Sequence, residues 1–139
     1  MLSQAYDLCE DGNFSDALKL YDLALKQEPG NINALIDKGV TLQNLGRIKQ
    51  AIKYYDKALG IDPKNINALV NKGASLHTIE KYKDAINCYD LALKSDKKCA
   101  MALAYKGLSL GELGNLADAL KYFKKALSID HDYDLANLS

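Results

Sequence analysis

The side chains that most often carry chemistry are few in this chain and lie far apart. Its 139 residues include three cysteines, Cys9, Cys88 and Cys99, and two histidines, His77 and His131. The histidines are 54 residues apart and neither lies near Cys9, so the spacing favours neither a nucleophilic pair nor a metal site. HExxH and glycine-rich phosphate-binding motifs are absent from the sequence, and its one GxSxG match, GLSLG at 107–111, directly follows a segment that repeats along the chain, as described below. We therefore expect no catalysis and no bound cofactor or metal.

Charge argues against a nucleic-acid partner. Lysine and arginine together number 18, as do aspartate and glutamate, so no net field draws the chain to nucleic acid or anionic lipid. Lys49, Lys53 and Lys57 form a short basic stripe that could contact an acidic partner or RNA. We interpret it instead as a solvated outer face of a helix, which is the more common role of such stripes.

Hydropathy and cysteine usage predict a cytoplasmic protein. No apolar run approaches the roughly 18 residues that a membrane span requires. The first residues, MLSQAYDLCEDG, lack the charged and then apolar segments of a signal peptide. The odd number of cysteines, with no CxxC pair, indicates reduced thiols.

The most informative pattern is a repeat of 34 residues. NINALIDKG at 31–39 returns as NINALVNKG at 65–73, and more loosely as CAMALAYKG at 99–107. Such self-similarity indicates a stacked array in which each unit shields the apolar face of its neighbour. The columns that share this period are glycine (Gly39, Gly73, Gly107), alanine (Ala17, Ala51, Ala85, Ala119), aromatic (Tyr21, Tyr55, Tyr89, Phe123), leucine (Leu8, Leu42, Leu76, Leu110) and a second alanine (Ala24, Ala58, Ala92, Ala126).

Each unit is predicted to be a pair of helices. In the second copy, apolar residues recur at helical spacing over 32–45 and 48–61, with a turn at Gly46 and Arg47 between them. Glycine in the interior of the first helix, at position 39 and its equivalents, costs roughly 1 kcal/mol relative to alanine. We expect close approach of the paired helix to offset this cost. The expected small residues opposite are Ala51, Ala85 and Ala119, with the aromatic column filling the space between units.

The junctions between helices differ from copy to copy. Gly12, Gly46 and Gly114 occupy one turn position, where glycine adopts a positive φ at little cost, but the third copy has Glu80 there. That turn is therefore expected either to differ in shape or to be weaker. Pro63 ends the second unit, because proline cannot extend a helix. Lys97 and His131 replace it in the later copies, where we expect the helix to fray or to continue.

These residues resemble a known family. A 34-residue helix-turn-helix with Gly39, Leu42, Gly46, Ala51, Tyr55, Ala58 and Pro63 at these offsets is similar to the tetratricopeptide repeat (TPR), over essentially the whole chain. The family's early tryptophan is replaced by Met1, Leu35, Leu69 and Leu103. The resemblance implies an all-α, right-handed α-solenoid of antiparallel helix pairs with about four TPR units. We divide this single array into repeats 1–31, 32–65, 66–99 and 100–133, followed by a truncated capping segment at 134–139.

The resemblance also implies a function, which is to hold a peptide or helix of another protein in a concave groove lined by the first helices. Amide side chains suit this task, because one amide can both donate to and accept from a peptide backbone of any sequence. We expect Asn71 to be the foremost contact; the alternative is that these residues are merely solvated. The predicted groove residues are Asn33, Ile36, Asp37, Val40, Asn44, Asn67, Asn71, Ala74, Thr78, Tyr105 and Leu108, and the same projection includes Gln43, Val70, His77, Met101, Ala104, Glu112 and, in the first copy, Leu2, Tyr6 and Glu10.

One class of partner is disfavoured. TPR proteins that bind the acidic C-terminal tails of heat-shock chaperones use a clamp of lysine, arginine and asparagine. The corresponding positions here are Ile36, Val40, Asn71, Met101 and Tyr105, so only the asparagine is kept. Without a cation, the charge-assisted capture of a carboxylate is lost.

The C-terminal end suggests an alternative function. Arrays of this kind usually finish with a capping helix that has a polar outer face. The last complete helix, predicted over 116–129, is expected to leave Phe123, Leu127 and Ile129 partly bare, with Leu135 and Leu138 covering some of that surface. Either the chain is a fragment of a longer array, or this end pairs with another subunit. The two hypotheses are therefore an adaptor that binds a partner in its groove and a self-assembling array that forms a homo-oligomer through its uncapped end.

Overall fold

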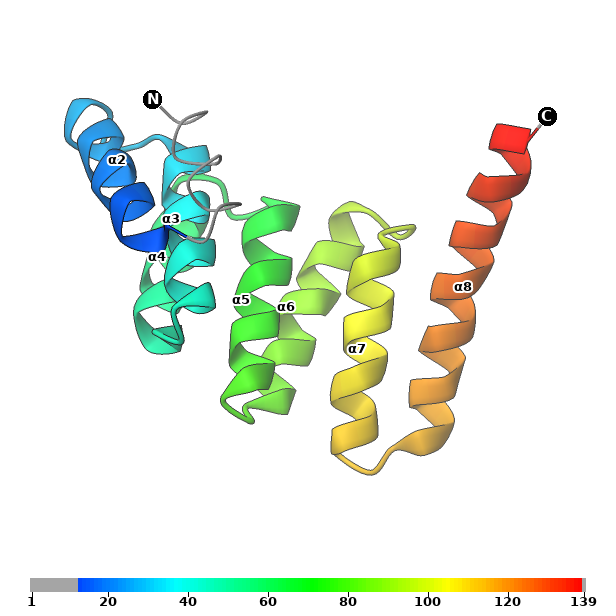
Figure 1. The fold of residues 1–139 in the computed structure, drawn as a ribbon. Coiled ribbons are helices and arrows are strands. Elements are labelled where there is room, and N and C mark those ends of the chain that lie inside the picture. The colour runs from blue at the N-terminus through cyan, green and yellow to red at the C-terminus, as the bar shows by residue number, and fades with distance from the viewer. Residues whose placement is uncertain (1–12, 139) are drawn as a thin grey trace.

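The computed structural model describes the backbone of residues 13–138 and the side chains of residues 13–129, and within these limits it contains helices and no strands. The predicted all-α solenoid is confirmed. The helices are α2 (Phe14–Gln27), α3 (Ile32–Asn44), α4 (Ile48–Ile61), α5 (Ile66–Thr78), α6 (Tyr82–Ser95), α7 (Ala100–Glu112) and α8 (Leu116–Leu138) (Figure 1).

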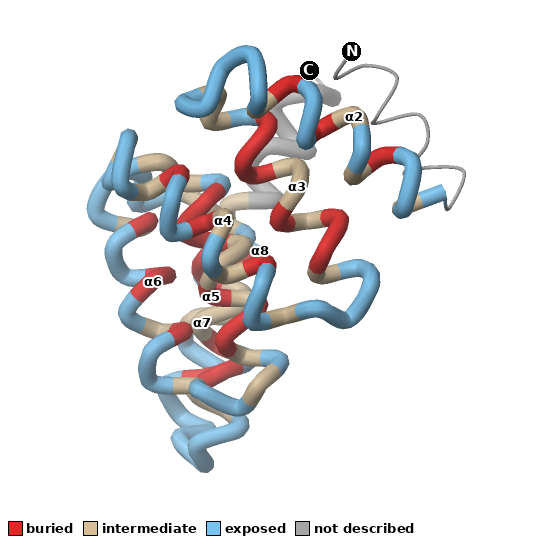
Figure 2. Tube along the Cα trace, turned by 90° about the vertical axis from the view of Figure 1, so that its left-hand side faces the viewer, coloured by how far each residue is buried: buried red, intermediate tan, exposed pale blue. Residues whose placement is uncertain are grey.

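The helices form two layers. Each helix packs against the next in the chain, and α3 also contacts α5, as α5 contacts α7. The inner layer therefore consists of α3, α5 and α7, with the outer helices α4 and α6 behind them (Figure 1). Buried residues lie on the sides of the helices that face one another, while the outer sides are exposed (Figure 2).

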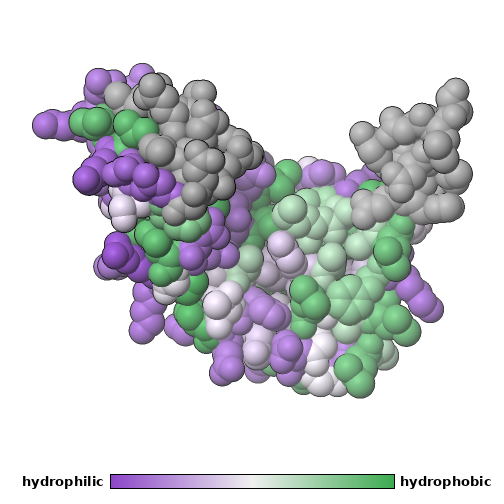
Figure 3. Space-filling view, viewed as in Figure 1, coloured by the Kyte–Doolittle hydropathy of each residue, from purple (hydrophilic) through white to green (hydrophobic). Residues whose placement is uncertain are grey.

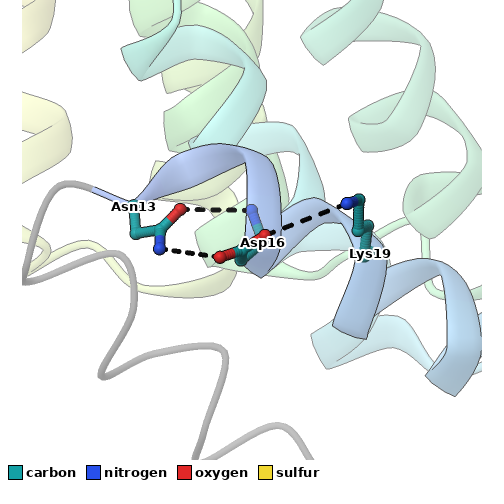
Figure 4. A network of polar contacts seen from close by, with 3 residues as sticks. All are labelled: Asn13, Asp16 and Lys19. Atoms are coloured by element: carbon teal, nitrogen blue, oxygen red, sulfur yellow. Dashed lines mark hydrogen bonds and ion pairs between the residues drawn. The ribbon is translucent and has the colours of Figure 1, made fainter.

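Asparagine side chains begin three of the helices. The Oδ1 atoms of Asn31 and Asn65 accept hydrogen bonds from the backbone N–H three residues later, at 3.1 and 3.0 Å. Asn13 Oδ1 accepts a hydrogen bond from the Asp16 backbone N–H at 3.4 Å, and its Nδ2 donates to the Asp16 carboxylate. That carboxylate lies 4.0 Å from the Lys19 ammonium (Figure 4). A cap of this kind is worth about 1 kcal/mol, so the sequence defines where these helices start.

The glycine column packs against aromatic rings, which corrects the expected partners. A Cβ atom on Gly39 would lie 2.5 Å from Cε1 of Tyr55, and one on Gly73 would lie 2.8 Å from Cζ of Tyr89. The rings therefore lie against the glycine of their own unit, where alanines were expected. Tyr55 and Tyr89 are 0% and 1% exposed, so this contact forms the centre of each helix pair.

The turn at Glu80 keeps the geometry of its glycine equivalents. Gly46 and Gly114 have φ values of +80° and +85°, and Glu80 has +65°. The expectation that this turn has a different shape is therefore wrong. The other expectation, a weaker turn, stays a prediction, because a side chain in this left-handed conformation costs about 1 kcal/mol. Gly12 lies outside the described residues.

The junctions without proline behave in opposite ways. α6 ends at Ser95 although Lys97 stands in the proline position, and Asp96 Oδ1 accepts a hydrogen bond from the Lys98 N–H at 3.0 Å in that turn. The expected fraying or continuation is therefore wrong at Lys97. At His131 it is confirmed, because α8 runs without a break to Leu138 and extends past the end of α7 (Figure 1). Residues 134–138 thus continue α8.

Replacing Gly73 by leucine should destabilise the protein by about 1–3 kcal/mol, because the new side chain overlaps the buried Tyr89 ring. The matched control is Gly60→Ala, also within a helix, where a Cβ has no neighbour within 4 Å. That change should stabilise by about 0.5–1 kcal/mol. Urea unfolding followed by circular dichroism measures both, and an unchanged midpoint for Gly73→Leu would show that the ring contact is not formed.

Replacing Glu80 by glycine should stabilise the protein by about 1 kcal/mol, because the positive φ is then unstrained. Gly114→Ala places a side chain in the equivalent turn and should destabilise it by a similar amount. Thermal melts of the two variants should shift in opposite directions. Shifts of the same sign would contradict the strain argument.

Candidate protein-interaction surface

The predicted groove residues are spread along the inner helices and differ in exposure. Asn33, Asn44, Asn67, Thr78 and Leu108 are exposed, whereas Asp37, Val40, Asn71, Ala74 and Tyr105 are half-buried. Leu2, Tyr6 and Glu10 lie outside the described residues. The inner layer therefore presents most of the predicted set to solvent, on α3, α5 and α7.

Ile36 and its equivalent Val70 are placed differently from the rest. Val70 is 4% exposed and lies in the core of its own unit. Ile36 is 7% exposed and packs in the core with Leu35, Leu42 and Tyr55. Its position faces the neighbouring helices, so almost none of its side chain can be reached by a partner. The helical projection could not separate this position from the groove face, because the two faces are adjacent on α3.

One pocket brings four predicted residues together. A cavity of about 180 Å³ lies between α5 and α7, lined by Ala74, Thr78, Tyr105 and Leu108. Gln43, His77 and Tyr89 complete its wall. Its lining combines apolar surface with a hydroxyl, an amide and an imidazole, which is a lining suited to a side chain of a bound segment.

The polar groups of α5 are partly engaged with their own helix. Asn71 Nδ2 donates to the Asn67 carbonyl at 2.8 Å, and Thr78 Oγ1 donates to the Ala74 carbonyl at 3.0 Å. These bonds hold the side chains in fixed positions. The Asn71 Oδ1 atom and its second N–H can still pair with a peptide backbone.

Gln43 and His77 have a structural task as well. Gln43 Oε1 accepts from Tyr55 Oη at 2.8 Å and from Ser75 Oγ at 2.9 Å, and so joins one unit to the next. His77 Nδ1 lies 2.8 Å from Ser109 Oγ in the following unit. Because Ser75 and Ser109 are fully buried, these bonds satisfy groups that would otherwise destabilise the stack.

A column of ion pairs joins successive units on the other side of the inner helices. Lys72 Nζ lies 2.6 Å from Asp56 Oδ1, and Lys106 Nζ lies 2.6 Å from Asp90 Oδ1. Lys38 pairs with Asp22 in the same way. Partial burial is the largest single effect and acts to lower the pKa of each lysine, but the hydrogen bond and the charge of the aspartate, together with smaller contributions from neighbouring groups, outweigh it and raise the pKa above its ordinary value. This column was not predicted, although its 34-residue period is visible in the sequence.

The C-terminal surface carries two apolar cavities. One of about 580 Å³ is lined by residues that include Tyr105, Phe123 and Leu127, and one of about 410 Å³ by residues that include Phe123, Leu116 and Leu120. Apolar side chains gather over α7 and α8 in Figure 3, and hydrophilic ones over α2 to α4.

The predicted bare residues are only part of this surface. Leu127 is 68% exposed, while Phe123 and Ile129 are half-buried. Leu116 and Leu120, at 71% and 54% exposed, were not predicted. Sequence alone could have identified Leu120, because the equivalent positions in earlier units are also leucine or isoleucine.

The described residues contain no group of three or more histidine, cysteine or acidic side chains that could hold a metal ion. Cys88 and Cys99 are free thiols, and burial raises the pKa of Cys88, which disfavours the reactive thiolate. Among the described helices, none is both long enough and apolar enough to span a membrane.

Comparison with protein-family models gives two matches. A model described as "Anaphase-promoting complex, cyclosome, subunit 3" matches residues 10–92, which is more than half of the chain. A model described as "Tetratricopeptide repeat" matches residues 100–133. Among curated proteins, no sequence is similar enough to count as a relative.

Solved structures show the same architecture. MamA 41-end from Desulfovibrio magneticus RS-1 is 25% identical, with a TM-score of 0.83, over 92% of this chain and 72% of that one. Another structure, titled "Crystal structure of MamA", is 25% identical with a TM-score of 0.82, over 90% and 73% of the two chains. A tetratricopeptide repeat protein from Parabacteroides merdae ATCC 43184 is 26% identical with a TM-score of 0.82, over 94% and 52%. The repeat period, the helix pairs and both family matches agree, and this chain belongs to the tetratricopeptide repeat family.

Proposed function

We propose that this protein is a scaffold that holds a segment of another protein against the inner face of α3, α5 and α7. The observation that carries the proposal is the pocket between α5 and α7, where apolar surface from Tyr105 and Leu108 lies beside the hydroxyl of Thr78. Asn71, one turn before that pocket on α5, supplies an amide for the partner's backbone. The name of the family model that matches 10–92 refers to a subunit of a multi-protein complex, which supports a protein partner.

The charges of the inner helices argue against an acidic tail as the bound segment. Lys38, Lys72 and Lys106 are the inner-helix lysines of the described units, and each is paired with an aspartate of the preceding outer helix. The positive charge of each lysine is therefore compensated by its aspartate, on the side of the inner helix that faces away from the pocket. Asp37 adds a carboxyl group to the inner face, and its half-buried position raises its pKa. An uncharged or apolar segment fits this face better than a carboxylate.

The test is partner capture by a groove variant. Asn71→Ala combined with Tyr105→Ala removes the amide and most of one pocket wall, and should reduce recovery of the specific partners from a native extract by at least about ten-fold, which corresponds to about 1.4 kcal/mol. Quantitative mass spectrometry of captured proteins gives the measurement. Thermal melts of the purified variants must first show that the array is still folded, because Tyr105 also contacts the Tyr89 ring.

The matched control changes two residues of the outer layer. Lys53 and Leu91 lie on α4 and α6 and are exposed, so Lys53→Ala with Leu91→Ala removes comparable side-chain volume from the opposite face. Capture should be unchanged for this variant. If both double variants capture the same partners as the unmodified protein, the groove is not the binding site.

Self-association is the second candidate function, and the exposed leucines of α8 favour it. Leu116 and Leu127 are 71% and 68% exposed, which is unusual for a surface that has no partner. The charge beside these leucines works against pairing of two identical surfaces, because residues 116–129 hold three lysines and one acid, while the other three aspartates of α8 follow at 130, 132 and 134. Light scattering over a wide concentration range tests this candidate, and a strict monomer removes it.

A further inference from the structure

The outer helices repeat one surface stripe, defined as an apolar residue, an aspartate four residues later and a leucine three residues after that. The three copies are Leu18, Asp22 and Leu25 on α2; Ile52, Asp56 and Leu59 on α4; and Ile86, Asp90 and Leu93 on α6. In each copy the two apolar residues are half-buried, because the next inner helix lies across them. Leu18 and Leu25 pack against the core of the second unit, and Ile52 and Leu59 against that of the third.

An ion pair joins each inner helix to the stripe that it covers. A lysine of α3, α5 or α7 pairs with the aspartate at the centre of the stripe on the preceding outer helix, as Lys72 does with Asp56 at 2.6 Å. The same helices carry an alanine four residues and a leucine three residues before that lysine, such as Ala68 and Leu69, which are 0% and 3% exposed. The covering helix therefore has the pattern alanine, leucine, two further residues, then lysine.

The fourth copy of the stripe is uncovered in the part of the chain that the structure describes. It consists of Leu120, Lys124 and Leu127 on α8. Leu120 and Leu127 are 54% and 68% exposed, whereas their equivalents in the earlier copies are half-buried. The two apolar cavities on either side of Phe123 lie along this stripe. The uncovered stripe thus combines two exposed leucines with apolar cavities that side chains of a covering helix could fill.

The charge at the centre of the fourth stripe is reversed. Lys124 stands where Asp22, Asp56 and Asp90 stand in the other copies. Lys121 and Lys125 flank it, and Asp118, the one acid of residues 116–129, is held by a hydrogen bond from Asn115 at 2.9 Å. A helix built like α3, α5 or α7 would bring its lysine against Lys124, and like charges in this position repel.

We propose that the stripe of Leu120, Lys124 and Leu127 is a docking site for an amphipathic helix of another protein that carries an acidic residue where the inner helices carry lysine. The occupant lies across α8 as α7 lies across α6, with a small residue and a leucine on the apolar cavities and a carboxylate on Lys124. A second copy of this chain is disfavoured, because pairing of two α8 surfaces brings their lysines together. Tyr105 and Leu108 line both the groove pocket and the edges of these cavities, but the leucines and the lysine of the stripe lie on α8, so the proposal does not depend on the proposed function.

A charge swap tests the proposal without knowledge of the natural partner. The probes are two helix-stapled peptides that copy residues 65–79, one unchanged and one with Lys72→Glu, because this segment is a covering helix of the array. Stapling removes the entropic cost of forming the helix. Fluorescence anisotropy measures their binding to the intact protein and to its Lys124→Asp variant, which should fold normally because Lys124 is exposed.

The intact protein should prefer the glutamate peptide by about five-fold, as expected for reversing one exposed charge pair, and Lys124→Asp should prefer the lysine peptide by a similar factor. Lys53→Asp, the same charge change on the outer face of α4, should keep the preference of the intact protein. Leu127→Asp should weaken binding of both peptides. The proposal is overturned if neither peptide binds, if both proteins show the same preference, or if the protein self-associates through this stripe and Leu127→Asp abolishes that association.

Discussion

The contact between a glycine and an aromatic ring inside each helix pair is the constraint on which the rest of the structure depends. Gly39, Gly73 and Gly107 have no Cβ, and the rings of Tyr55, Tyr89 and Phe123 occupy the space where it would be. Each glycine weakens its helix by roughly 1 kcal/mol, but a buried aromatic side chain returns more than that. Because the contact recurs every 34 residues, every pair has the same spacing and every unit can stack in the same way.

This regular stacking explains the inter-unit contacts. Once the pairs are equally spaced, a lysine on one inner helix lies over an aspartate on the preceding outer helix in each unit, and Gln43 and His77 reach the buried serines of the following unit. The same geometry defines the surface that remains after the last pair. The exposed leucines of α8 are the positions that an inner helix covers elsewhere in the array.

Much of the fold could be predicted from the sequence, because its period is strict. The bounds of α4 were predicted to the residue, and those of α3 to within one residue. The residues that contact the glycine column were not predicted correctly. Periodicity identifies which residues share a column, but it does not show which columns meet across a helix pair. The Lys38, Lys72 and Lys106 column was missed for a related reason: a charged column looks the same in sequence whether it pairs across units or faces water.

The candidate site was less predictable than the fold. Projection placed Ala74, Thr78, Tyr105 and Leu108 on one face, and the structure brings them to one pocket, but it also assigned the buried Ile36 to that face. Small differences in helix rotation decide such cases, and they depend on the packing of neighbouring helices. Likewise, residues 96–98 form a turn and residues 130–138 do not, although both positions lack the proline that ends the second unit.

The most direct measurement of the central contact is a nuclear Overhauser spectrum of the protein in solution. The account predicts strong cross-peaks between the Hα protons of Gly39, Gly73 and Gly107 and the ring protons of Tyr55, Tyr89 and Phe123, with the glycine signals displaced by the ring currents. Cross-peaks from these glycines to the methyl groups of Ala51, Ala85 and Ala119, with none to the rings, would contradict it.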